Sequence, residues 1–437
     1  AAFQQEGSLV AFLPLPVEEK TLMPDWPKVK VLFDEVAKLV QYGVIRSASV
    51  VREGGVAAAV ARMCFGNRIG FAFNRDVSRK TLFTPQLGSL VAELKEGDMC
   101  LEGLTYSLIG TTLDEAMIVI DGEELELDAL RDRWMVPLEG VFPNRAAQEP
   151  DEPAGIPLHT ERAAKAPAIK AAKPRVFIPV FPGTNCEYDS ARAFERAGAQ
   201  AEILVVRNLT PAAIEETIVR MEQAIRRSQI IMLPGGFSGG DEPDGSGKFI
   251  ATTFRNPRLK DAVAELLGER DGLMLGICNG FQALIKLGLV PYGEIRDLDE
   301  TCPTLTFNLI GRHQSSYVTT RVASVKSPWL SSCQVGDLHS IAISHGEGRF
   351  VAPQAEIERL EANGQIAFQY TDLAGNPSMD IAFNPNGSMC AIEGITSPDG
   401  RVLGKMGHTE RFSPYVGKNI YGEKYQPIFE NGVKYFK

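Results

Sequence analysis

The stretch Leu273-Met274-Leu275-Gly276-Ile277-Cys278-Asn279-Gly280 decides the fold of the larger part of the chain. Its apolar run predicts a buried strand, and the two glycines predict a sharp turn into a helix over residues 279–287. Upstream, the same alternation recurs, with apolar runs separated by helical patterns before 197 and over 211–226. Strands that alternate with helices predict an α/β fold with a doubly wound, mostly parallel sheet. The other expected strands are 176–180, 201–206 and 230–233.

The composition is that of an ordinary globular protein and narrows the possible functions. The chain has 437 residues, 44% of them apolar, and a net charge of -10. This acidic balance offers no basic surface for nucleic acid or anionic lipid, and no apolar run is long enough to span a membrane. The seven cysteines are scattered without a CxxC pair, which favours free thiols, a cytoplasmic location and no metal site.

A segment rich in proline and alanine, residues 143–174, divides the chain. Such a composition cannot build a packed core, so we expect a linker or a strap that lies over a surface. Residues 1–142 before it predict a smaller α+β domain, a sheet with helices on one face, and residues 175–437 form the α/β domain. The chain begins with Ala1 rather than Met, which suggests a fragment of a longer protein.

The turn around Cys278 has the spacing of a nucleophile elbow, glycine-x-nucleophile-x-glycine. A cysteine at a helix N-terminus is favoured as the reactive thiolate. The backbone N–H of Asn279 would face a developing oxyanion, and the glycine-rich turn at Gly236 and Phe237 could supply a second donor. The alternative is that Cys278 is only a small buried side chain after a strand.

A thiol nucleophile needs a base, and two histidines compete for that role. His408 precedes Glu410 by two residues, so the carboxylate could orient the imidazole if the segment is extended. His345 lies in a dense polar cluster over residues 344–350, which suits binding of a polar ligand. A surface position for His408 beside a chance carboxylate is the alternative.

Two further features have competing interpretations. Cys186 also follows a strand and a glycine turn, but Tyr188 stands where an elbow needs a small residue, so we expect Cys186 to line the site or serve the structure. Gly54 and Gly55 precede a helical pattern and could bind phosphate at its N-terminus. Packing or turn geometry explains such a pair equally simply.

These motifs resemble those of the class I glutamine amidotransferases of the triad type, which have a flavodoxin-like sheet. The resemblance is carried by residues 276–280 with Gln282, by residues 234–238, and by His408 with Glu410. With residues 182–187 and 345–349 added, 174–437 are similar to the glutaminase domains of phosphoribosylformylglycinamidine synthases. Residues 52–65 and 88–94 resemble the C-terminal half of an aminoimidazole-ribonucleotide-synthetase-like repeat.

The resemblance implies that Cys278 attacks the carboxamide of glutamine, that His408 protonates the departing ammonia and that Glu410 orients His408. It implies an oxyanion hole at Gly236 and Asn279, and substrate binding by Gln282, Phe237 and His345. The ammonia would serve purine biosynthesis in the remaining synthetase domains, where ATP and magnesium are expected; no cofactor is expected in this fragment. Another Cys-His hydrolase on the same fold and a non-catalytic assembly module are the alternatives.

Overall fold

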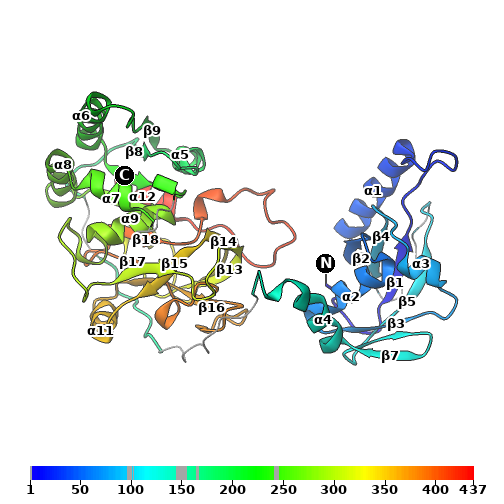
Figure 1. Ribbon diagram of the computed structural model, residues 1–437. Helices are drawn as coiled ribbons and strands as arrows, with labels where there is room; N and C mark the ends of the chain where they lie inside the picture. Colours follow the sequence, from blue (N-terminus) through cyan, green and yellow to red (C-terminus); the bar gives the residue numbers. More distant parts are fainter. Residues whose placement is uncertain (1, 96–100, 102, 144–154, 164–166, 241–245) are drawn as a thin grey trace. The chain divides into compact units, whose positions relative to one another are not determined.

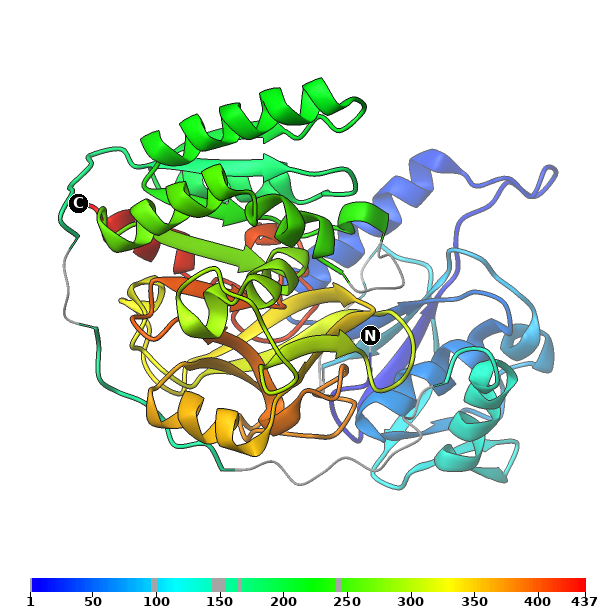
Figure 2. The ribbon, with the colours of Figure 1, turned by 60° about the vertical axis from the view of Figure 1, so that its left-hand side comes forward.

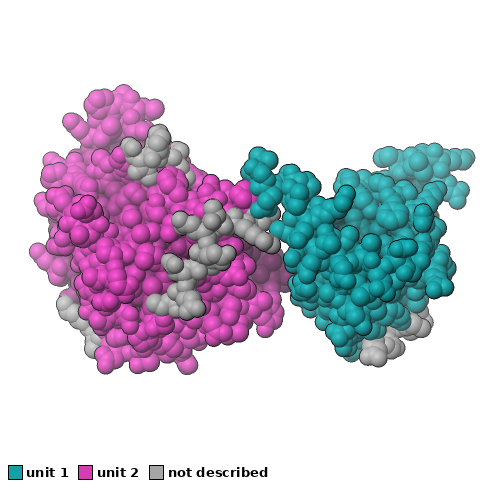
Figure 3. All heavy atoms as spheres, turned by 60° about the horizontal axis from the view of Figure 1, so that its bottom comes forward, with its two compact units in different colours: residues 1–142 teal, residues 143–437 magenta. Residues whose placement is uncertain are grey.

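The computed structural model divides the chain into two compact units, residues 1–142 and 143–437, which Figure 3 shows in different colours. The structure describes residues 2–95, 101, 103–143, 155–163, 167–240 and 246–437. No helix within these ranges is long and apolar enough to cross a membrane.

The second unit is built around a nine-stranded sheet (Figure 1). Four of its strands, β8 to β11, lie almost at the predicted bounds, and the α/β class is confirmed. The strands of this unit are β8 (Arg175–Val180), β9 (Gln200–Val205), β10 (Ile230–Leu233), β11 (Leu273–Ile277), β12 (Thr304–Phe307), β13 (Gln314–Val322), β14 (Leu338–His345), β15 (Glu347–Val351), β16 (Ile366–Thr371), β17 (Ile392–Thr396) and β18 (Val402–Lys405).

The sheet has a parallel part and an antiparallel part. Its order is β14-β13-β16-β17-β18-β11-β10-β8-β9, and the pairings from β9 to β18 are parallel. From β18 onward every pairing is antiparallel, an extension that the sequence pattern did not reveal. In Figure 2 the parallel strands β8 to β11 are green and the strands β13 and β14 at the opposite edge are yellow. Strands β12 and β15 form a separate small sheet.

Helices cover both faces of the parallel part, as a doubly wound fold requires. Helix α5 packs on β8, β9 and α12, whereas α6 packs on β8 and α8, and α7 joins α8 to α9 on that second face. The helices are α5 (Glu187–Arg196), α6 (Pro211–Arg227), α7 (Lys248–Phe254), α8 (Pro257–Gly268), α9 (Asn279–Leu287), α10 (Leu289–Tyr292), α11 (Gln354–Ala362) and α12 (Ile428–Lys434).

The junction between β11 and α9 is packed so closely that only glycine fits at its second small position. A Cβ atom on Gly280 would lie 1.9 Å from the carbonyl oxygen of Leu233 on the neighbouring strand. A Cβ on Gly276 would in turn lie 2.5 Å from Leu284 of α9. The two glycines therefore let helix α9 approach the sheet directly after Cys278.

We expect Gly280→Ala to destabilise the second unit by about 3 kcal/mol or more, because the new methyl overlaps backbone that cannot move away. Urea unfolding of the full chain measures this change. Gly268→Ala is the matched control, since a Cβ on Gly268 would meet no neighbouring atom within 4 Å and the residue ends a helix. The control should be neutral or slightly stabilising, and equal effects of the two substitutions would contradict the packing argument.

The first unit contains a seven-stranded sheet in the order β2-β4-β1-β5-β3-β6-β7. Its strands are β1 (Leu9–Leu13), β2 (Ile45–Val50), β3 (Gly70–Phe73), β4 (Leu90–Leu94), β5 (Ser107–Leu113), β6 (Met117–Ile120) and β7 (Glu123–Glu126). Its helices are α1 (Trp26–Gln41), α2 (Gly55–Asn67), α3 (Arg79–Phe83) and α4 (Leu127–Glu139).

Helices lie on both faces of this sheet, so the expectation of helices on one face was wrong. Ala11 and Leu13 of β1 pack in one core with Leu32 of α1. Val10 and Phe12 point the other way, into a core with α2. The physical reason is visible in β1 itself, whose residues are all apolar, because a strand with two apolar faces needs cover on both sides.

The structure gives Gly54 and Gly55 a packing role. Both have positive φ, and a Cβ on Gly55 would lie 2.4 Å from the carbonyl oxygen of Leu82. This contact accounts for the glycine pair without a ligand.

The described part of the proline- and alanine-rich segment is a strap on the second unit. The backbone N–H of His159 donates to Ala323 at 2.9 Å, and the N–H of Val325 donates back to His159 at 3.1 Å. Arg162 donates to the carbonyl oxygens of Leu330 and Cys333 at 3.0 and 2.7 Å. Of the two interpretations, the strap is therefore the correct one for these residues.

Candidate active site

Cys278 lies at the tip of the elbow, between the end of β11 and the start of α9. Its φ of +52° belongs to the left-handed region that residues with a side chain rarely adopt. The backbone N–H donates to the carbonyl oxygen of Lys405 at 2.8 Å, and Sγ lies 3.7 Å from the carbonyl oxygen of Ser344. Strand β18 thus fixes the cysteine from one side, while β14 approaches its sulfur from the other.

His408 and Glu410 form a buried pair next to this cysteine. Nδ1 of His408 lies 2.6 Å from Oε1 of Glu410, and both side chains are at most 1% exposed. Burial lowers the pKa of His408, but the charges of Glu410 and Cys278 outweigh it and raise the pKa well above its ordinary value. Burial likewise raises the pKa of Glu410, and the charge of His408 turns the balance and lowers it. Glu410 therefore stabilises the protonated form of the imidazole.

His345 is fully enclosed and differs from His408 in its partners. Its Nδ1 lies 3.2 Å from the amide oxygen of Asn308, and Nε2 has no hydrogen-bond partner among the described residues. Burial lowers the pKa of His345 to about 3, so the ring is neutral. Within the described part of the chain no carboxylate orients it, because Glu347 instead accepts from the N–H of Ser246 at 2.7 Å. Of the two competing histidines, only His408 has the partner that a base requires.

Three turns that follow parallel strands meet at one edge of the sheet, as expected from their topology. Thr184, in the turn after β8, pairs with Gly236 in the turn after β10. The side chain of Asn279 accepts from the N–H of Ser238 at 3.3 Å, which joins the second turn to the elbow. Gly235 is packed against the imidazole, since a Cβ there would lie 2.7 Å from Cε1 of His408. The glycine-rich turn therefore borders the reactive groups directly.

Phe237 and Gln282 occupy different surroundings. Phe237 is exposed, and its ring centroid lies 6.1 Å from that of His313. Gln282 is buried, accepts from Nδ2 of Asn279 at 2.9 Å and donates to the carbonyl oxygen of Glu347. Because both ends of its amide are bonded within the protein, Gln282 braces β15 against α9.

A pocket of about 270 Å³ is formed around residues 311–313 and Glu347. His313 lines it, and Nε2 of His313 lies 3.1 Å from the hydroxyl of Ser344, whose carbonyl contacts Cys278. Arg312 and Glu347 line its wall, and Oε1 of Glu347 lies 3.6 Å from Nζ of Lys286. Such a wall suits a small zwitterion. The sequence placed Glu347 in the polar cluster over residues 344–350 but gave it no role of its own.

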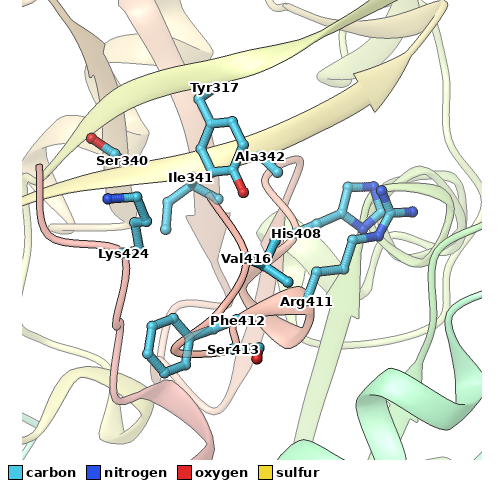
Figure 4. A pocket seen from close by; sticks show the side chains of 10 residues that line it. All are labelled: Tyr317, Ser340, Ile341, Ala342, His408, Arg411, Phe412, Ser413, Val416 and Lys424. Atoms are coloured by element: carbon cyan, nitrogen blue, oxygen red, sulfur yellow. The ribbon is translucent and has the colours of Figure 1, made fainter. Parts of the chain in front are cut away.

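Cys186 and Arg411 lie next to the imidazole of His408. Arg411 was not singled out from the sequence. Sγ of Cys186 is 3.9 Å from Nδ1 of His408, and Arg411 donates to that sulfur at 3.1 Å. Figure 4 shows His408 and Arg411 together at one end of a pocket, with Ser340 and Lys424 at the other end. The one feature of the sequence that could have indicated Arg411 is its position directly after Glu410.

Cys186, His408 and Glu410 are the described residues that could hold a metal ion, since one ligand atom of each lies within 4.8 Å of the others. These atoms already serve one another or Arg411 as hydrogen-bond partners. A guanidinium on the sulfur also opposes a second cation there. The arrangement is that of a thiol, an imidazole and a carboxylate suited to nucleophilic attack on a carbonyl.

Comparison with known proteins gives consistent matches for the second unit. The family of CobB/CobQ-like glutamine amidotransferase domains matches residues 173–436. A protein named phosphoribosylformylglycinamidine synthase subunit PurQ from Methanococcus maripaludis is 32% identical over 281 residues, which cover 60% of this chain and 97% of that protein. The protein of the same name from Aquifex aeolicus is 34% identical over 236 residues, 54% of this chain and 89% of the relative.

Among solved structures, PurLQS from Thermotoga maritima matches with 27% sequence identity and a TM-score of 0.44. The match covers 61% of this chain and all of the matched chain.

Proposed function

This chain belongs to the family of CobB/CobQ-like glutamine amidotransferase domains, and from that membership we propose that its second unit is the glutaminase of a phosphoribosylformylglycinamidine synthase. The PurQ relatives, of which the chain covers nearly the full length, support this assignment. The observation that carries the chemistry is Cys278 on a strained elbow beside the buried His408–Glu410 pair.

In the proposed reaction, the Cys278 thiolate attacks the side-chain carboxamide carbon of glutamine. The N–H groups of Gly236 and Asn279 receive the oxyanion, and His408 transfers its proton to the nitrogen as the carbon–nitrogen bond breaks and ammonia leaves. Neutral His408 then takes a proton from water, which attacks the glutamyl thioester and releases glutamate. The cycle regenerates the thiolate and the imidazolium, and Glu410 holds the ring throughout.

The pocket beside Ser344 is the proposed binding site of the glutamine backbone. Its wall offers Arg312 to the α-carboxylate and Glu347, whose Oε1 also lies 3.6 Å from Nζ of Lys286, to the α-ammonium, with Phe237 near His313. Gln282 is proposed to act indirectly, by holding the backbone of Glu347. His345 is proposed to support the pocket through Asn308 as a neutral ring.

The partner of this glutaminase is proposed to be the synthetase part of the same enzyme. There, ATP and magnesium would serve the conversion of formylglycinamide ribonucleotide to the amidine with the delivered ammonia. The glutaminase step as proposed uses no cofactor. Residues 1–142 are proposed to be the C-terminal half of an aminoimidazole-ribonucleotide-synthetase-like repeat. Free thiols at all six described cysteines support a cytoplasmic location.

The test is mass spectrometry of the full chain after exposure to an electrophilic glutamine analogue. We expect a single adduct on Cys278 that excess glutamine prevents, together with release of glutamate from glutamine. The Cys186→Ala variant should be labelled like the parent protein, and Cys278→Ala should remain unlabelled. An adduct that glutamine does not suppress would instead favour another Cys-His hydrolase. Complete inertness of both thiols toward the analogue would favour a non-catalytic assembly module.

A further inference from the structure

A fully buried lysine contacts the backbone on both sides of His408. Lys405, the last residue of β18, and Glu393 of β17 are both 0% exposed, with 3.5 Å between Nζ and Oε1. Nζ of Lys405 donates to the carbonyl oxygen of Gly407 and to the hydroxyl of Thr409, each at 2.9 Å. The residues on either side of His408 are thus both held by one ammonium group.

Glu393 completes the hold on the same segment. Its Oε1 accepts from the backbone N–H of Gly407 at 2.6 Å. A Cβ on Gly407 would lie 2.9 Å from that carboxylate oxygen and 3.1 Å from Nζ of Lys405. Both members of the ion pair therefore lie close to the backbone of Gly407. Thr409 in turn donates to Gln426 at 2.8 Å, which fixes its hydroxyl.

The same lysine also fixes the nucleophile through its backbone. The carbonyl oxygen of Lys405 accepts from the N–H of Cys278 at 2.8 Å. Its side chain holds the segment of His408, and its main chain holds the elbow of Cys278. A single residue therefore connects the two groups that must meet during the reaction.

Stability does not explain such a pair. Removing two charges from water costs several kcal/mol for each ion, and apolar residues of similar volume often serve a core as well or better. Nζ of Lys405 also lies 5.3 Å from the ring centroid of Phe368. What the pair supplies beyond apolar packing is directed hydrogen bonds to Gly407 and Thr409.

We propose that Lys405 and Glu393 are positioning residues of the glutaminase, which set the placement of His408 relative to Cys278. This inference rests on the proposed function and adds two residues that touch neither substrate nor the reacting atoms. A displacement of a catalytic group by about 1 Å can reduce a rate by about 100-fold. We therefore expect the Lys405–Glu393 ion pair to affect kcat rather than the binding of glutamine.

The test compares glutamine hydrolysis by the full chain and by the double variant Lys405→Met with Glu393→Gln. The double change removes both charges together, keeps side-chain volume and leaves no unpaired buried ion. We expect kcat to fall by about 10- to 100-fold, while KM changes by less than about twofold. Thermal unfolding of each variant is measured in parallel.

The matched control is Arg401→Met with Asp271→Asn. This variant removes a partly buried ion pair of 3.2 Å just before the start of β18, away from the site. It should lower the unfolding temperature comparably and leave kcat unchanged. If the first double variant folds and keeps kcat within twofold of the parent protein, the inference is wrong, and an equal loss of kcat in the control also overturns it.

If the Lys405 and Glu393 double variant does not fold, the variant Thr409→Val tests the inference in its place. This change deletes one acceptor of the ammonium without altering charge, and it should lower kcat by at least about threefold at constant KM. An unchanged kcat overturns the inference. Failure of the proposed function is distinguishable from all of these outcomes, because the parent protein itself would then release no glutamate.

Discussion

Replacing Cys278 by alanine is expected to lower the rate of glutamine hydrolysis by about 10⁴-fold or more, because it removes the sulfur that would form the thioester. The substitution removes one sulfur from a residue that is 4% exposed and leaves the elbow glycines in place. The fold should therefore persist. Glutamate release measured with an enzyme-coupled assay, together with circular dichroism, separates loss of chemistry from loss of structure.

Cys186→Ala is the matched control for this experiment. Cys186 is also buried and lies near the same imidazole, but Arg411 and Asn185 occupy its sulfur at 3.1 and 3.0 Å. We expect this variant to retain activity within about tenfold, because it disturbs only the surroundings of His408. If the two alanine variants lose activity equally, Cys278 is not the unique nucleophile.

Replacing Glu410 by glutamine is expected to reduce kcat by about 10³- to 10⁴-fold, as neutralising the orienting carboxylate does in other triads. The carboxylate raises the pKa of His408, so its removal lowers that pKa toward or below the ordinary value. His408 is then neutral at neutral pH and cannot protonate the departing ammonia. The loss should be larger at mildly alkaline than at mildly acid pH, because acid restores the proton.

Nuclear magnetic resonance of the histidine side chains checks the cause. In the parent protein His408 should titrate above the ordinary range, and in the Glu410→Gln variant it should titrate lower. Glu356→Gln, which breaks an ion pair of 2.8 Å with Arg359 on helix α11, is the control and should change neither the activity nor this titration. An unmoved His408 resonance in Glu410→Gln would contradict the assigned pairing.

The parallel part of the fold was predictable because its strands are short apolar runs between amphipathic helices. The antiparallel extension was not, because β13 begins with Gln314-Ser315-Ser316-Tyr317, a polar run that does not indicate a sheet strand. Both cores of the first unit could have been foreseen from β1, in which the residues of both faces are apolar. The pattern of apolar residues identifies a strand only where burial of one or both of its faces requires apolar side chains.

The candidate site was predictable where its geometry is local. The elbow spacing and the interval between His408 and Glu410 both follow from a few neighbouring residues. The approach of Cys186 to His408 joins positions 222 residues apart, and no local pattern encodes it. The burial of Lys405 was equally invisible, since a lysine at the end of a strand is usually solvated.

The strap affects how a pull along the chain would reach the parallel part of the second unit's sheet. Tension along the chain reaches His159, bonded to Ala323 and Val325, before it reaches β8. Those residues follow β13 in the antiparallel part of the sheet, and Arg162 adds two further anchors to Leu330 and Cys333. A pull along the chain therefore loads these bonds before it loads β8. The elbow follows β11, two strands beyond β8 in the sheet order, so it is not the first element to take the load.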